Sequence, residues 1–153
     1  MTYLGNEEIL KNHKIAFFCS QKCPAEVILK SFDWAIEQRN KGNCIVTGAH
    51  SPVEKDVFQF LIKGKQPLIL VLGRNSKKPL DNALIKSIDS NRLIVIYPFD
   101  ENCIRISQQI SYNRNQYIAE LADEIFVAYA TPGGNIEKLL NDSTGKKICS
   151  FEV

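Results

Sequence analysis

Several features that would point directly to a class of protein are scarce in this 153-residue sequence. It has two histidines, one tryptophan and one methionine, and its five cysteines are an odd number spread along the chain. Small disulfide-bonded secreted domains carry denser, even sets of cysteines. We therefore expect reduced thiols and a cytoplasmic location.

Long apolar runs and an excess of one charge are also missing. No run approaches the ~20 residues of a membrane-spanning helix. The first 14 residues include Glu7, Glu8 and Lys11 where a signal peptide would be apolar. Nineteen basic and 17 acidic residues give a net charge of +2, which argues against a histone-like tail or an acidic disordered segment. No membrane partner is expected.

Standard nucleotide-binding and catalytic motifs are absent as well. The sequence has no G-x-x-x-x-G-K-[ST] loop, no G-x-G-x-x-G after its first apolar run, and no G-x-S-x-G turn. Cys19 and Cys23 lack the second cysteine pair that a zinc site would need. We predict neither a metal nor a cofactor.

What the sequence does contain is a regular alternation of apolar runs with amphipathic stretches. Strands that alternate with helices form βαβ units, and their crossovers are right-handed. The pattern therefore predicts an α/β fold: a three-layer Rossmann-like sandwich with a mainly parallel, doubly wound sheet of about six strands. The length and the absence of a linker predict a single domain over residues 1–153. The expected strands are Lys14–Ser20, Asn43–Thr47, Gln66–Leu72, Arg92–Tyr97, Glu124–Ala130 and Lys146–Phe151, and the expected helices are Pro24–Asn40, Ser51–Lys63, Leu80–Asp89, Asn113–Ala122 and a stretch that ends near Asn141.

Two strand-to-helix turns have the features of an anion site. In such a sheet, ligands bind at the carboxyl ends of the strands. The first turn, Thr47–Glu54, joins a glycine to a helix start, where free N–H groups attract anions. Ser51 and Glu54 also fit a capping box, which explains them equally well without a ligand. The second turn, Thr131–Asn135, has paired glycines that allow close backbone approach, or it is a plain turn capped by Asn135.

Three basic residues near these strand ends are candidate phosphate contacts: Lys22, Arg74 and Arg114. Arg114 stands at the start of an expected helix, beside Asn113. For each of the three, an exposed side chain without a ligand is the alternative.

Several segments, taken in order, resemble the Rossmann-like domain of the DNA-processing protein A family (DprA, or Smf). Asn113–Asp123 resembles the family's R-N-R-x-I-A-x-L-S-D stretch, and Ile69–Arg74 resembles its I-x-V-L-x-x-G strand. Thr47-Gly48 is similar to the family's S-G, and Phe18–Gln21 is similar to its V-G-S/T-R. The resemblance covers most of residues 14–140 and implies membership of the SLOG superfamily, which includes the LOG phosphoribohydrolases (the lysine decarboxylase-like proteins).

The sequence departs from the family pattern at specific positions. Gln21 stands where the family has arginine, and Gln116 replaces the second arginine of R-N-R. Pro132–Glu137 partly resembles the P-G-G-x-G-T-x-x-E motif of the LOG group, but it is two residues shorter and lacks the Gly-Thr.

The resemblance implies a domain that binds the phosphates of a nucleotide or of single-stranded nucleic acid, with a role in DNA processing or uptake and a homodimeric state. Two alternatives stay open. One is a non-catalytic carrier or sensor of a small nucleotide-like ligand. The other is a LOG-type nucleotide phosphoribohydrolase, in which Arg114 holds the phosphate and Glu54 or Glu137 acts as the catalytic carboxylate. The expected ligand-binding residues are Ser20, Gln21, Lys22, Gly48, Ala49, His50, Ser51, Glu54, Arg74, Asn113, Arg114, Thr131, Pro132, Gly133, Gly134 and Asn135.

Overall fold

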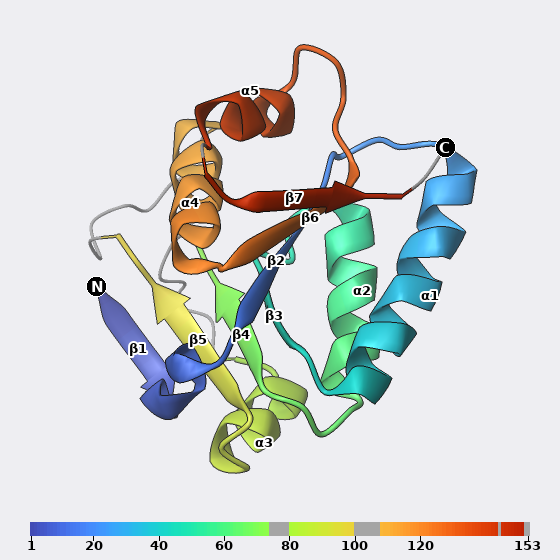
Figure 1. The fold of residues 1–153 in the computed structure, drawn as a ribbon. Coiled ribbons are helices and arrows are strands. Elements are labelled where there is room, and N and C mark those ends of the chain that lie inside the picture. The colour runs from blue at the N-terminus through green and yellow to red at the C-terminus, as the bar shows by residue number, and fades with distance from the viewer. Residues whose placement is uncertain (74–79, 100–107, 144, 152–153) are drawn as a thin grey trace.

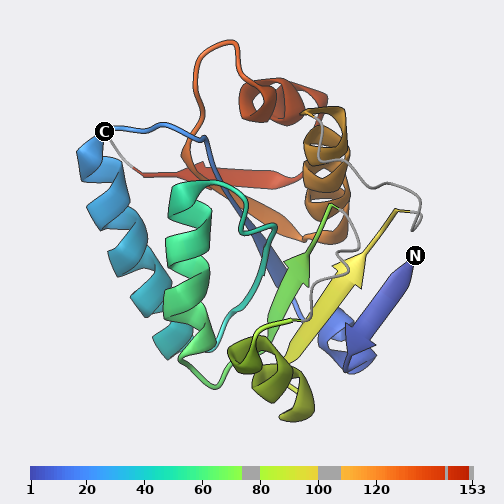
Figure 2. The same ribbon diagram turned by 180° about the vertical axis from the view of Figure 1, so that it is seen from behind.

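A twisted sheet between two layers of helices forms the protein (Figures 1 and 2). The computed structural model describes residues 1–73, 80–99, 108–143 and 145–151. The described residues form seven strands in the order β1-β5-β4-β3-β2-β6-β7. β1 pairs antiparallel with β5, and every other pairing is parallel. The strands are β1 (Thr2–Gly5), β2 (Lys14–Cys19), β3 (Cys44–Thr47), β4 (Leu68–Val71), β5 (Leu93–Tyr97), β6 (Glu124–Tyr129) and β7 (Lys147–Ser150).

The helices cover both faces of the sheet, and this confirms the predicted doubly wound sandwich. Apolar side chains of α1, α2 and α3 pack on one face, and those of α4, α5 and the short 3₁₀ helix η1 pack on the other. Successive strand residues point to opposite faces, so Phe17 joins the first cluster and Phe18 the second. The helices are η1 (Glu7–Lys11), α1 (Ala25–Lys41), α2 (Pro52–Ile62), α3 (Asn82–Asp89), α4 (Gln108–Leu121) and α5 (Asn135–Asp142).

Three local predictions differ from the structure. The sheet has one strand more than expected, because the four-residue β1 is too short and too exposed to show an apolar pattern. Pro24 is the N-cap of α1 and not its first helical residue. Among the described residues, α4 begins at Gln108, five residues before the expected start at Asn113. The sequence pattern did not show this start, because the first turn of the helix is mostly polar.

The order of the strands places a topological switch point beside β2. From β2 the chain proceeds through β3, β4 and β5 on one side, and α4 then carries it back to β6 on the other side. The carboxyl ends of β2, β3 and β6 therefore meet at one edge of the sheet, where doubly wound folds bind ligands. Within the described ranges, no helix is both long enough and apolar enough to cross a membrane.

Candidate anion-binding site

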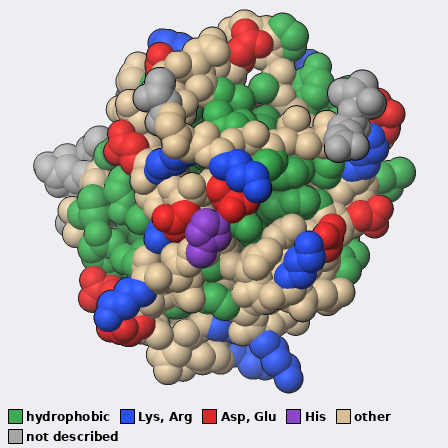
Figure 3. All heavy atoms as spheres, viewed as in Figure 1, with side chains coloured by type: hydrophobic (Ala, Val, Ile, Leu, Met, Phe, Trp, Pro, Cys, Tyr) green, Lys and Arg blue, Asp and Glu red, His purple; other side chains and the backbone are tan. Residues whose placement is uncertain are grey.

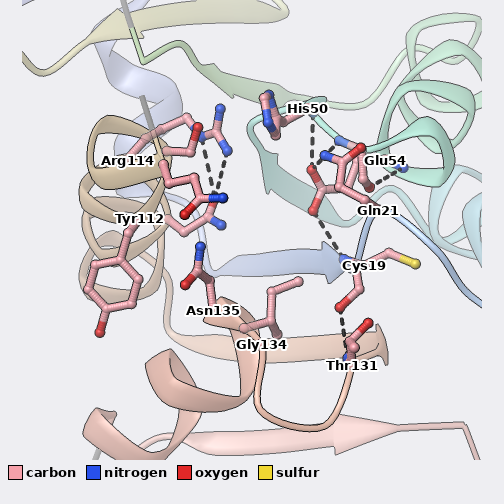
Figure 4. Close-up of a pocket in the computed structure, with 15 residues that line it drawn as sticks. Cys19, Gln21, His50, Glu54, Tyr112, Arg114, Thr131, Gly134 and Asn135 are labelled. Carbon is pink, nitrogen blue, oxygen red and sulfur yellow. Dashed lines mark hydrogen bonds between the residues drawn. The ribbon is translucent and has the colours of Figure 1, made fainter. Parts of the chain in front are cut away.

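A cavity of about 400 Å³ lies at this edge, between α4 and the start of α5 (Figure 4). The residues after β2, β3 and β6 contribute to its wall together with one face of α4. The lining residues are Cys19, Ser20, Gln21, His50, Ser51, Glu54, Gln108, Ser111, Tyr112, Arg114, Asn115, Thr131, Gly134, Asn135 and Ile136.

Most of the expected ligand-binding residues are brought together here. Those that line the cavity are Ser20, Gln21, His50, Ser51, Glu54, Arg114, Thr131, Gly134 and Asn135. Lys22, Gly48, Ala49, Asn113, Pro132, Gly133 and Glu137 are not among the lining residues. Arg74 lies outside the described residues.

Arg114 is a buried cation on the wall of this cavity. It lies in the middle of α4 and not at a helix start, which corrects the prediction, and only 4% of its surface is exposed. Its Nε and Nη2 donate to Oδ1 of Asn115 at 3.3 and 3.2 Å, and no carboxylate of the described residues forms an ion pair with it. Burial lowers the pKa of Arg114, while Glu54 opposes that shift. A guanidinium has five N–H donors, and the hydrogen bonds within the described residues use two of them, which leaves three for a ligand.

Gly48 forms the surface against which Arg114 lies. A Cβ at this position would stand 2.7 Å from Nε of Arg114 and 3.1 Å from its Cδ. Only glycine leaves room for the Arg114 side chain to approach the backbone this closely. Gly48 does not itself line the cavity.

The carboxylate of Glu54 occupies the start of α2. Its Oε1 accepts hydrogen bonds from the backbone N–H groups of His50 and Ser51 at 3.0 and 3.1 Å, and its Oε2 accepts one from Cys19 at 3.0 Å. The hydroxyl of Ser51 accepts the N–H of Glu54, which confirms the predicted capping box. Burial raises the pKa of Glu54, and the three N–H donors and Arg114 oppose the rise. These N–H groups, predicted to be free for a ligand, are thus already paired.

The start of α5 is different, because its backbone donors are open. Gly134 is the N-cap and offers no side-chain acceptor, so the alternative of a plain turn capped by Asn135 is wrong. No hydrogen bond of the described residues uses the N–H groups of Asn135 or Ile136, and both residues line the cavity. Glu137 accepts the N–H of Gly133 through Oε1 at 3.2 Å, so its carboxylate is engaged with its own turn.

Two further side chains set the chemistry of the wall. Burial, followed by the charges of Arg114 and Lys55, lowers the pKa of His50, which favours the neutral imidazole. Burial and the neighbouring Cys23 raise the pKa of the Cys19 thiol, so this thiol is a poor nucleophile. No cluster of metal-ligating side chains is present in the described part of the chain.

Sequence reasoning missed the contribution of the first turns of α4. Gln108, Ser111 and Asn115 stand three and four residues apart and face the same cavity. This polar stripe was not recognised because the start of the helix was placed too late. The missed lining residues are Cys19, Gln108, Ser111, Tyr112, Asn115 and Ile136.

Together these features give the cavity groups of the kind that bind anions. A buried guanidinium and an uncapped helix N-terminus line one cavity, and Figure 4 shows Arg114 and Asn135 on the same side of it. Both candidate catalytic carboxylates accept backbone N–H groups.

No family model matches the chain, and no curated protein is significantly similar to it in sequence. Solved structures do match its fold. DNA processing protein A from Helicobacter pylori has a TM-score of 0.73 at 14% identity, over 99% of this chain and 71% of that one. DprA from Streptococcus pneumoniae has a TM-score of 0.70 at 21% identity, over 99% of this chain and 54% of that one. The chain thus spans only about half the length of the streptococcal protein.

A molybdenum cofactor binding protein from Rippkaea orientalis is also similar, with a TM-score of 0.60 at 10% identity, over 92% of this chain and 78% of that one. These likenesses define the class as α/β proteins with a Rossmann-like sandwich. Within that class, the chain has the fold of DNA processing protein A, so the resemblance seen in the sequence is confirmed as a likeness of fold.

Proposed function

We propose that the protein is a DprA-like domain of the SLOG superfamily that binds a phosphate group of a nucleotide or of single-stranded nucleic acid. The buried Arg114, which has no acidic partner among the described residues and lines the same cavity as the uncapped start of α5, carries the proposal. Guanidinium groups and helix N-termini are the preferred partners of phosphate. The H. pylori relative in fold is described as a single-stranded DNA binding protein, which supports the same ligand class.

The distribution of charge favours local recognition of a phosphate over wrapping of a long strand. The net charge is only +2. On the face shown in Figure 3, positive and negative side chains are interspersed and no patch of one sign stands out. Domains that track a nucleic acid backbone are usually more basic than this. The pocket, and not the surface at large, is therefore the proposed contact.

A non-catalytic carrier or sensor of a small nucleotide-like ligand is the second candidate. It is favoured by the likeness to a molybdenum cofactor binding protein and by a cavity of about 400 Å³, which is near the small end of ligand pockets. A LOG-type phosphoribohydrolase is the weakest of the three, because Glu54 and Glu137 both serve as acceptors for backbone N–H groups.

The proposal includes a single domain, a homodimeric state and a cytoplasmic location. The cysteines of the described residues are free thiols, which suits a reducing compartment.

Fluorescence anisotropy of a labelled 5′-phosphorylated single strand of about 20 nucleotides, at two salt concentrations and with AMP as competitor, tests the proposal. We expect binding that weakens with salt, because phosphate contacts release counterions. Arg114→Ala should weaken it about tenfold or more, as loss of a charged hydrogen-bonding partner does.

Lys30→Ala, which removes an exposed charge from α1, is the matched control and should leave binding unchanged. Failure of both the strand and AMP to bind at low salt would exclude the proposed function. Binding of AMP alone would favour the carrier, and release of free adenine from AMP would favour the hydrolase.

A further inference from the structure

The two helix N-termini near the cavity differ in how far a carboxylate of the chain uses their donors: Glu54 accepts three N–H groups at the start of α2, whereas Glu137 accepts only that of Gly133 at the start of α5. At α2, the carboxylate of Glu54 accepts the N–H groups of Cys19, His50 and Ser51, and Ser51 accepts that of Glu54. Pro52, the first residue of α2, has no N–H to offer. An incoming anion therefore finds few donors there.

At α5, the N-cap supplies no side-chain acceptor, and the N–H groups of Asn135 and Ile136 are open. Arg114 lines the same cavity, is 4% exposed and, within the described part of the chain, keeps donors without a partner. This half of the cavity is thus lined by one buried cation and by unused donors, and the carboxylate of Glu137 is not among its lining residues.

Glu54 also lines the cavity, so its carboxylate faces whatever ligand enters (Figure 4). Its side chain is buried, with 3% of the residue exposed, so solvent screens a charge on it poorly. Burial works against the charged form, and the N–H groups of Cys19, Ser51 and His50 favour it. The three N–H donors fix it in place on β2 and α2, so it cannot swing away to admit a second anion.

We propose that the cavity takes a ligand with one phosphate group, held by Arg114 and the start of α5, and that Glu54 excludes a second phosphate linked directly to the first. This inference rests on the proposed function and adds the substrate class: a phosphate monoester and not a pyrophosphate. Glu54 acts as a specificity-determining residue through like-charge repulsion and through its occupation of the α2 donors.

The test compares AMP with ADP by isothermal titration calorimetry on the full chain, with adenosine as the uncharged reference. We expect AMP to bind about tenfold or more tightly than ADP, because one unfavourable charge pair at low dielectric is enough for that factor. Adenosine should bind more weakly than AMP, since it cannot engage Arg114.

Glu54→Gln removes the charge while it keeps the shape and one acceptor oxygen. We expect the preference for AMP over ADP to fall about threefold or more. Glu37→Gln, which removes the same charge from the exposed face of α1, is the matched control and should keep the wild-type ratio. Thermal melting of each variant shows whether it is folded.

The outcomes separate the two proposals. ADP binding as tightly as AMP to the wild-type protein overturns the inference and leaves the proposed function intact. If folded Glu54→Gln keeps the wild-type ratio of AMP affinity to ADP affinity, Glu54 is not the cause of the preference. Absence of binding by AMP and ADP alike overturns the inference, and the proposed function falls with it only if the 5′-phosphorylated single strand also fails to bind. If Glu54→Gln does not fold, the comparison of AMP and ADP affinities for the wild-type protein decides the inference alone.

Discussion

At the scale of single residues, Arg114 shows a conflict between stability and binding. A buried cation without an acidic partner costs the folded state free energy, and a hydrophobic residue of similar volume in its place is often stabilising. We expect Arg114→Met to raise the free energy of unfolding by about 1 kcal/mol or more. Urea unfolding measures it, and the same variant should lose phosphate binding.

A lowered free energy of unfolding for Arg114→Met would contradict this view and would assign Arg114 a structural role. Arg92 is the useful contrast, because its guanidinium donates to the carbonyls of Leu61, Ile62 and Gln66. Arg92→Met should destabilise the fold, since it removes a donor from each of those carbonyls and only that of Leu61 keeps another among the described residues, from Gln66.

Gly48 gives a second prediction at this scale. Because a Cβ would stand 2.7 Å from Nε of Arg114, Gly48→Ala should displace the guanidinium. We expect a loss of about 1 kcal/mol in stability from overpacking and an about tenfold weaker affinity for AMP. In the Arg114→Met background the same change should have little further effect on AMP binding, and additive effects there would contradict a shared mechanism.

At the scale of elements, Asp123 joins the starts of β2 and β6. Its Oδ2 accepts the backbone N–H of Lys14 at 2.8 Å, and its own N–H donates to the carbonyl of Lys14 at 2.8 Å. The N–H of Lys14, followed by the charge of Lys14, lowers the pKa of Asp123 below its usual value. An acid whose pKa is lower in the folded state stabilises the fold at pH values above its unfolded pKa, which is about 3.9 for Asp. This stabilisation is lost as the pH falls through the pKa of the folded state.

We therefore expect Asp123→Asn to be less stable than the wild type at pH 7, with the difference shrinking below about pH 4. Urea unfolding between pH 7 and pH 3 measures it. Glu120→Gln, an exposed acid of α4, is the control, and a difference between Asp123→Asn and wild type that does not change with pH would contradict the assignment.

The elements also show how far the sequence alone could lead. The strands buried on both faces were predictable, because β4 and β5 are continuous apolar runs. The capping box of α2 was predictable because its two residues stand three apart in the chain. The contact of Glu54 with the N–H of Cys19 was not, because it joins residues 35 positions apart. The early start of α4 was hidden by its polar first turn.

At the scale of the whole molecule, β1 protects one edge of the sheet. It pairs with β5, whose five residues are all buried. A variant that lacks residues 1–5 would leave the backbone donors and acceptors of β5 exposed beside apolar side chains, which promotes edge-to-edge pairing. We expect its apparent mass to rise with concentration in size-exclusion chromatography with light scattering, relative to the full chain. Identical profiles for the two proteins would exclude this role for β1.

The pairing of β2 with β6 has a consequence for the time course of folding. The two strands meet at Lys14 and Asp123, which are 109 residues apart, and loop closure on this scale is slow. During synthesis, β2 therefore waits for its second neighbour, β6, until most of the chain has left the ribosome. Since the wall of the cavity needs β2, α4 and α5 together, ligand affinity appears only after this last pairing. Nucleotide binding would then report completed folding. In a refolding experiment, the signal from a bound fluorescent nucleotide should recover later than the helical circular dichroism signal.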